Sequence, residues 1–324
     1  MRKILLTGGA GNVGSAMAQG LLTEPDTYLT VVDDLSTGNI NKLPQNHPNL
    51  KFIKADVNNR EEITDIMLSN QFDYVFHYAA YVGVQRTQEN PIRVLNDIDG
   101  IKHILSLSKN TGVKRFFFSS SSEVYGEPVT IPQHEEKTPL NSRVPYAVVK
   151  NVGEAFCKSY MQEYNLDYTI FRFLNTYGPN QTQDFVMTKF ISQALQNKPI
   201  TIYGDGSQTR TFCYVSDNIE ATIKALNNDL FVNDVINIGG ETVISILELA
   251  ELIIKLTDSK SEITFLPPLK DGDMTRRQPD NSKMKAILGR ELITVEEGIK
   301  KLLVDPTFIQ QMELKAEWAK KNGI

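Results

Sequence analysis

The chain has 324 residues, of which 41% are hydrophobic and 23% are charged, and its formal net charge is -5. This length and composition predict a globular protein with one large or two modest domains. The acidic balance and the lack of a basic run argue against a nucleic-acid partner, and two cysteines are too few for a disulfide framework. No apolar stretch approaches the ~20 residues of a membrane span, so we expect a cytoplasmic protein without a membrane partner.

The amino-terminal segment has the pattern of a strand, a glycine-rich turn and a helix. Residues 3–6 have a strand's length, and a helical pattern covers residues 15–22. Glycines between them permit a tight turn and let the backbone approach a pyrophosphate, which the helix amino terminus then holds. The predicted dinucleotide contacts in this turn are Gly8, Gly11, Asn12, Val13 and Gly14. The spacing differs from the Gly-x-Gly-x-x-Gly fingerprint, so this turn alone is a weak signal.

Acidic residues follow the next two predicted strands. Asp33 and Asp34 end the strand at residues 29–32, about 20 positions past the turn, where a carboxylate binds the adenosine ribose. Such a carboxylate repels a 2'-phosphate, so the sequence favours NAD over NADP. Asp56 and Val57 follow the third strand. In one interpretation Asp56 contacts the adenine, and in the other it caps a turn or a helix.

Strands and helices then continue to alternate, which predicts a parallel sheet. The predicted helices between these strands are residues 60–69 and 91–109. A fourth strand at residues 74–77 is followed by Ala79 and Ala80, whose small side chains leave room for a cofactor. Asn96 falls in the middle of a helix, an unfavourable place for asparagine unless its side chain has a task.

The catalytic signal lies in the middle of the chain. A fifth strand at residues 115–118 delivers a serine run at its carboxyl end, where open α/β sheets bind ligands. The helix at residues 145–164 then carries Tyr146 and Lys150 on one face, so the ammonium can favour the phenolate. With a serine hydroxyl, this set suits proton removal from a sugar hydroxyl as hydride leaves its carbon. Tyr-x-x-x-Lys also arises by chance, and the cofactor signals are what support a catalytic role here.

The later chain changes to short elements and turns after a sixth strand at residues 168–172. Capping boxes beginning at Ser245 and Thr294 predict two further helices. We predict that this part forms a smaller lobe that covers the substrate.

Together these motifs resemble the extended short-chain dehydrogenase/reductases called the NAD-dependent epimerase/dehydratase family. The similar segments are residues 7–14, 33, 56–57, 77–80, 96, 119–126, 146–150, 172–179, 203–206, 210–215 and 277–280. The resemblance implies an α/β fold, with a Rossmann-type doubly wound parallel sheet and a smaller C-terminal substrate-binding lobe. The implied NAD-binding domain is residues 1–175 and 211–238, and the nucleotide-sugar-binding lobe is residues 176–210 and 239–324.

The resemblance also implies NAD as cofactor, a nucleotide-diphosphate sugar as substrate, no metal, and a homodimer through the Tyr146 helix. Tyr146 would be the base, Lys150 its electrostatic partner and a ribose contact, and Ser121 the hydroxyl on the sugar oxygen. Asn175 would hold a diphosphate oxygen, and the arginines would pair with the phosphates. The implied substrate contacts are Ser122, Asn175, Tyr203, Arg210 and Arg277.

Members of this family share oxidation at sugar C4, which gives a 4-keto intermediate and NADH, and they differ in the fate of that intermediate. Residues 78–86 and 145–147 resemble 4-epimerases, whereas residues 122–126 and the Arg277 region resemble UDP-glucuronate decarboxylases. The family's 4,6-dehydratases carry Thr-Asp-Glu where this chain has Ser121-Ser122-Glu123, so dehydration is disfavoured. We predict a 4-epimerase, with the decarboxylase as the alternative.

Two questions stay open at this point. Glu123 is a catalytic carboxylate in one interpretation and a solvated turn residue in the other. Val82 and Lys270 stand where some members carry lysine and arginine, so the nucleotide and the sugar are undetermined. A module that senses NAD without turnover is disfavoured, because such proteins generally lose the tyrosine or the lysine.

Overall fold

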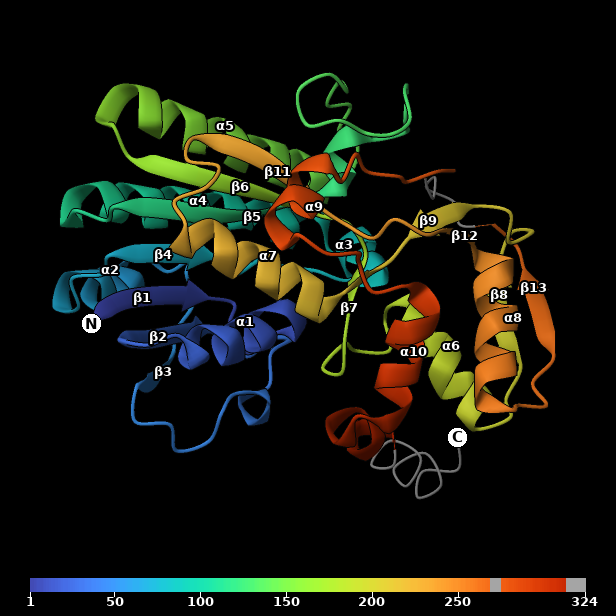
Figure 1. Cartoon of the computed structure of the whole chain (residues 1–324). Coiled ribbons are helices and arrows are strands. Elements are labelled where there is room, and N and C mark those ends of the chain that lie inside the picture. Colours follow the sequence, from blue (N-terminus) through green and yellow to red (C-terminus); the bar gives the residue numbers. More distant parts are fainter. Residues whose placement is uncertain (269–274, 313–324) are drawn as a thin grey trace.

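The computed structural model describes residues 1–268 and 275–312. Its larger part is a seven-stranded parallel sheet between two layers of helices, with strand order β3-β2-β1-β4-β5-β6-β11 (Figure 1). The strands are β1 Arg2–Thr7, β2 Thr27–Asp33, β3 Leu50–Lys54, β4 Tyr74–His77, β5 Arg115–Ser121, β6 Asp167–Phe173 and β11 Asp234–Ile238. The first six follow the Rossmann order, in which the winding reverses between β1 and β4. The predicted fold class is confirmed.

Helices cover both faces of this sheet. One face carries α1 Asn12–Thr23, α7 Val215–Asn227 and α9 Ser282–Leu288, and the other carries α2 Arg60–Ser69, α4 Pro91–Thr111 and α5 Pro145–Tyr164. Because both faces are buried, the strands are continuous apolar runs. In β5, Phe117 enters one core, while Phe116 and Phe118 enter the other. A short helix, α3 Val84–Glu89, follows β4.

A smaller lobe lies beside the sheet (Figure 1). It has its own apolar core. It contains α6 Val186–Leu195, α8 Ile246–Thr257 and α10 Val295–Val304, with β8 Ile200–Tyr203 pairing parallel to β13 Ile263–Leu266. Two further pairs are β9 Thr209–Thr211 with β12 Val243–Ser245, and β7 Thr176–Tyr177 with β10 Cys213–Tyr214. The predicted capping boxes at Ser245 and Thr294 are both present, at the starts of α8 and α10.

Three elements differ from the sequence-based expectation. β5 runs on to Ser121, so three of the four serines belong to the strand itself, and the turn after it is the 3-10 helix η2 Ser122–Tyr125. α1 begins at Asn12 rather than at residue 15, which places Val13 and Gly14 in its first turn. A second 3-10 helix, η1 Ile40–Lys42, follows β2. Among the described residues, no helix combines the length and apolar content that crossing a membrane requires.

Candidate active site

The tyrosine and one serine of the predicted catalytic set meet where β5 ends. α5 begins with Pro145, whose fixed φ and missing N–H suit the first helical position. The next residue, Tyr146, is thereby held at the carboxyl edge of the sheet, close to the Ser121 hydroxyl, an interaction that lowers the pKa of Tyr146. Ser121 Oγ also accepts the Glu123 backbone N–H at 3.2 Å and so caps η2. The strand end and the helix start therefore present two hydroxyls at one place.

Lys150 lies one turn further along α5 and is almost fully buried. Its Nζ is 5.7 Å from the Tyr146 ring centroid and 5.1 Å from that of Phe118. Burial lowers the pKa of Lys150 to about 8, an effect that the Asp97 carboxylate opposes. Lys150 is thus a charged ammonium at neutral pH and loses its proton in mildly alkaline solution.

The pKa of Tyr146 is raised well above its ordinary value. Burial is the main cause, and the Glu123 carboxylate adds to it. The hydrogen bond to Ser121 and the Arg277 guanidinium act in the opposite direction. A further cation next to the phenol would lower its pKa and make it a usable base.

Glu123 and Arg277 form an ion pair beside Tyr146. Arg277 Nη2 donates to Glu123 Oε1 at 2.5 Å, and both side chains are largely buried. Arg277 Nε is also buried and has no hydrogen-bond acceptor among the described residues. The solvated-turn interpretation of Glu123 is therefore wrong. Arg277, which the resemblance implies at the phosphates, lies beside Glu123 and interacts electrostatically with Tyr146.

The glycine turn has the close packing that a phosphate cradle requires. Gly8 has φ +69°, and a Cβ added there would lie 2.5 Å from the Ala79 backbone nitrogen. A Cβ at Gly14 would lie only 2.1 Å from the Gly8 carbonyl oxygen. The Asn12 side chain adds a buried Oδ1 that has no partner among the described residues. The turn is thus too closely packed for side chains at Gly8 and Gly14, and it leads into the amino terminus of α1, the kind of place that can hold a phosphate.

The acidic residues at the strand ends differ in their surroundings. Asp33 is 8% exposed, and its carboxylate oxygens accept the Ala10 and Leu35 backbone N–H groups, both at 2.9 Å. Asp34 is exposed and binds its own turn through Ser36. The geometry therefore favours Asp33 over Asp34 as the ribose ligand.

Asp56 shows the turn role that one interpretation assigned to it. Its carboxylate accepts the Asn58 backbone N–H at 2.9 Å, and its own N–H donates to Glu62. It remains partly accessible, so an adenine contact is compatible with this arrangement. Val57 beside it is buried in the core under α2 and α4. Ala79 and Ala80 follow β4 and are half-buried, with Ala79 N donating to Thr7 Oγ1 at 3.3 Å.

Asn96 does not face this site, and its neighbour does. Asn96 is exposed on α4, whereas Asp97 is partly buried and accepts the Tyr81 backbone N–H at 2.7 Å. The Asn58 side chain also hydrogen bonds to this carboxylate, and burial raises its pKa. Asp97 interacts electrostatically with both Lys150 and Tyr146. The predicted helix is present, and Asp97, the residue next to the predicted Asn96 and rotated from it by about 100°, is the one that interacts with Lys150 and Tyr146.

We expect replacement of Asp97 by asparagine to move the alkaline limb of the kcat/KM profile to lower pH. The groups facing Lys150 are Asp97 from α4, His77 from β4 and Tyr146 on its own helix. Among the described residues, Asp97 alone stabilises the ammonium, so removing its charge lowers the pKa of Lys150 below about 8. Asp99→Asn, an exposed acid on the same helix, is the control. An unchanged limb in Asp97→Asn would show that Lys150 does not set it.

The predicted substrate contacts are spread between the sheet edge and the smaller lobe. Asn175 has φ 43° and donates its side-chain amide to the Thr211 carbonyl at 2.8 Å. Arg210 is 5% exposed and donates to the Thr209 carbonyl at 2.7 Å. Tyr203 is 42% exposed, with Lys189 Nζ 5.2 Å from its ring centroid. Ser122 is buried in η2, and Lys270 lies outside the described residues.

The structure also reveals Glu154, a residue that the sequence-based prediction did not include. It follows Lys150 by four residues, so Tyr146, Lys150 and Glu154 form one polar stripe on the buried side of α5. That repeat of four was the signal that could have identified it. Within residues 1–268 and 275–312, no cluster of three or more His, Cys, Asp and Glu side chains is placed to hold a metal ion.

The residues of the glycine turn and the strand ends fit a dinucleotide, and comparisons with known proteins agree. A model of the NAD dependent epimerase/dehydratase family matches residues 4–239. UDP-glucuronic acid decarboxylase 1 of Danio rerio is 35% identical over 93% of this chain and 72% of its own length.

Two solved structures share the fold over nearly their whole length. UDP-glucose 4-epimerase of Thermotoga maritima, solved with UDP-glucose, has TM-score 0.87 and 31% identity over 95% of this chain and 99% of its own. UDP-glucuronic acid 4-epimerase of Bacillus cereus, solved with UDP-glucuronic acid and NAD, has TM-score 0.85 and 30% identity, covering 96% and 99%. This chain belongs to the NAD-dependent epimerase/dehydratase family of nucleotide-sugar enzymes, whose cofactor is NAD.

Proposed function

We propose that this protein is a nucleotide-sugar 4-epimerase that works through transient oxidation at sugar C4. The observation that carries the proposal is the arrangement around Tyr146. Ser121 lies close to the phenol, Lys150 lies against the ring, and Glu123 is already paired with Arg277. A 4-epimerase needs a single group to remove and return one proton, and Tyr146 is that group.

The proposed mechanism assigns each residue a role at a defined atom. When bound, NAD supplies the acceptor and donor of hydride at C4. Tyr146 takes the proton of the C4 hydroxyl, and Ser121 holds the same oxygen by a hydrogen bond. The Lys150 ammonium, charged below a pKa of about 8, favours the phenolate and contacts the nicotinamide ribose. Tyr146 returns the proton once the keto sugar has turned its other face.

We assign the cofactor to the sheet edge and the rest of the substrate to the smaller lobe. Gly8 and Gly14 hold the pyrophosphate, and Asp33 binds the adenosine ribose. Asn175 and Arg210 face the diphosphate of the sugar nucleotide. Tyr203 contributes from β8, where its exposed ring offers a surface for the nucleoside.

Decarboxylation of UDP-glucuronate is the second candidate, and the position of Arg277 favours it. Arg277 is close enough to Tyr146 to influence the pKa of the phenol, so it lies near the reacting carbon. A guanidinium there can exchange Glu123 for a carboxylate on the sugar. The 35% identity with a UDP-glucuronic acid decarboxylase supports the same candidate.

The test is to analyse the products by mass spectrometry with retention time. The purified protein is incubated separately with UDP-glucose, UDP-N-acetylglucosamine and UDP-glucuronate. A product of unchanged mass and shifted retention is expected from at least one of them. Loss of carbon dioxide from UDP-glucuronate would replace epimerisation with the second candidate.

Glu123→Gln separates the two reactions by a different route. If the enzyme is an epimerase, we expect kcat to fall less than about tenfold, because no proton passes through Glu123. Since the carboxylate raises the pKa of Tyr146, its removal lowers that pKa and shifts the acidic limb of kcat/KM to lower pH. Glu127→Gln, an exposed neighbour that binds Thr275, is the control. A loss above about 100-fold would instead assign proton transfer to Glu123.

A further inference from the structure

A buried ion pair lies directly beneath the catalytic residues. Glu154 of α5 and Arg172 of β6 are each about 1% exposed. Arg172 donates from Nε to Glu154 Oε1 at 2.8 Å and from Nη2 to Oε2 at 2.7 Å, a bidentate geometry. Ser120, the strand neighbour of Ser121, donates to Glu154 Oε1 at 2.6 Å. Glu154 therefore ties the helix that carries Tyr146 to β6 through Arg172, and to β5, the strand that carries Ser121, through Ser120.

The guanidinium extends this link to the turn that carries Glu123. Arg172 Nη1 donates to the Tyr125 hydroxyl at 2.9 Å and to the Glu135 carbonyl at 3.0 Å. Tyr125 closes η2, and its hydroxyl donates to Asn237 Oδ1 at 2.7 Å. One charged group thus holds both α5 and η2.

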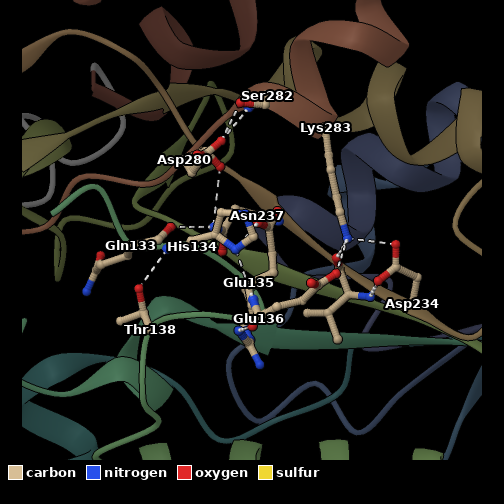
Figure 2. A network of polar contacts seen from close by, with 12 residues as sticks. Gln133, His134, Glu135, Glu136, Thr138, Asp234, Asn237, Asp280, Ser282 and Lys283 are labelled. Atoms are coloured by element: carbon tan, nitrogen blue, oxygen red, sulfur yellow. Dashed lines mark hydrogen bonds and ion pairs between the residues drawn. The ribbon is translucent and has the colours of Figure 1, made fainter. Parts of the chain in front are cut away.

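The far side of the network is anchored to β11. Asn237 donates its backbone N–H to Glu135 Oε1 and its side-chain amide to the Gln133 carbonyl, both at 2.8 Å (Figure 2). Lys283 of α9 binds Asp234 at 2.7 Å in the same region (Figure 2). The segment around Glu135 is therefore fixed to the sheet and gives Arg172 a rigid second support.

We propose that the Glu154–Arg172 pair is a positioning device that sets the Ser121–Glu123 turn against the Tyr146 helix. Stability alone does not explain such a pair, because apolar residues of similar volume are often as stable as a buried ion pair. Geometry does explain it, because Glu154 binds Ser120 beside Ser121 and Arg172 binds Tyr125 of η2. Through these contacts the pair connects α5 with the strand and turn that must present a hydroxyl to the same substrate oxygen. A misplacement of about 1 Å in such a site can cost about 100-fold in rate. This role rests on the proposed function of Tyr146.

The experiment replaces the pair by an apolar one, Glu154→Leu with Arg172→Met. We expect a thermal midpoint close to that of the starting protein and unchanged NAD content. On the nucleotide sugar that is turned over, kcat falls about 10- to 100-fold while KM changes less than about threefold. The control is Asp217→Asn with Arg290→Met, which removes a partly buried ion pair between α7 and the segment after α9, away from α5 and η2.

A second readout does not need a substrate. The Glu123 N–H is held by Ser121 Oγ, so a displaced η2 exchanges its amide hydrogens faster, and hydrogen exchange of residues 121–126 measures this. If the starting protein turns over none of the sugars tested, the proposed function is refuted. Faster exchange in the double variant would then still show that the pair holds the turn in place. If the folded double variant has the same kcat and the same hydrogen-exchange rates at residues 121–126 as the starting protein, the positioning role is refuted.

If the double variant does not fold, Glu154→Gln can distinguish a positioning role from a structural one. Glutamine keeps one oxygen that accepts hydrogen bonds from Ser120 and Arg172. Measured below its own thermal midpoint, this variant is expected to lower kcat less than the double replacement would and to leave KM unchanged. If this variant has the kcat of the starting protein at that temperature, and the same exchange rates at residues 121–126, the pair has only a structural role.

Discussion

Tyr146→Phe is expected to lower turnover about 1,000-fold while the protein keeps its fold and its NAD. Phenylalanine retains the ring that packs near Lys150 but has no proton to exchange with the C4 hydroxyl. Positioned general acid–base groups contribute about 100- to 10,000-fold, and within residues 1–268 and 275–312 no other group is placed to replace this one while Glu123 stays paired with Arg277. The measurement is kcat on the nucleotide sugar that is turned over, together with NAD content.

Tyr164→Phe is the matched control, because this tyrosine lies at the far end of α5 and is 49% exposed. It should retain full activity. Residual turnover of Tyr146→Phe should also lose the pH dependence that the phenol imposes. A Tyr146→Phe variant with turnover near that of the starting protein would show that another residue moves the proton.

The sheet and its helices were predictable because local signals and the global fold agree. Residues 60–69 and 145–164 were predicted as helices, and α2 and α5 have those bounds. The capping boxes at α8 and α10 were equally visible in the sequence. Because the carboxyl ends of parallel strands share one edge, the glycine turn, Asp33 and Tyr146 could be placed near one another without any long-range information.

What the sequence did not reveal depends on helix phase and on distant contacts. The choice of Asn96 over Asp97 required knowing how α4 is rotated against the sheet, which a polar helix surface does not specify. The pairing of Glu123 with Arg277 joins residues 154 positions apart. The repeat of four along α5 could have identified Glu154, but its partner Arg172 lies on β6, and the sequence does not show that the two meet. Such pairings arise from tertiary packing, and no local pattern encodes them.

Gly14→Ala is expected to weaken NAD binding on the order of 100-fold, because its Cβ has no free volume. The new methyl group would lie 2.1 Å from the Gly8 carbonyl oxygen and 2.7 Å from Gly9 Cα, and backbone atoms cannot move aside as a side chain does. Overpacking of this kind costs ~1–3 kcal/mol, and here it displaces the turn that holds the pyrophosphate. The measurement is the NAD content of the purified protein and calorimetric titration of the NAD-free form.

Gly20→Ala makes the same change on the same helix in different surroundings. Its Cβ would meet the side-chain ends of Ile219 and Ile223, which belong to α7 and not to the turn. We expect Gly20→Ala to lower the thermal midpoint by a few degrees and to bind NAD with the starting affinity. Equal loss of NAD affinity in both variants would mean that α1 packing, not the Gly14 backbone approach, determines cofactor binding. Loss confined to Gly14→Ala would identify the turn itself as the phosphate cradle.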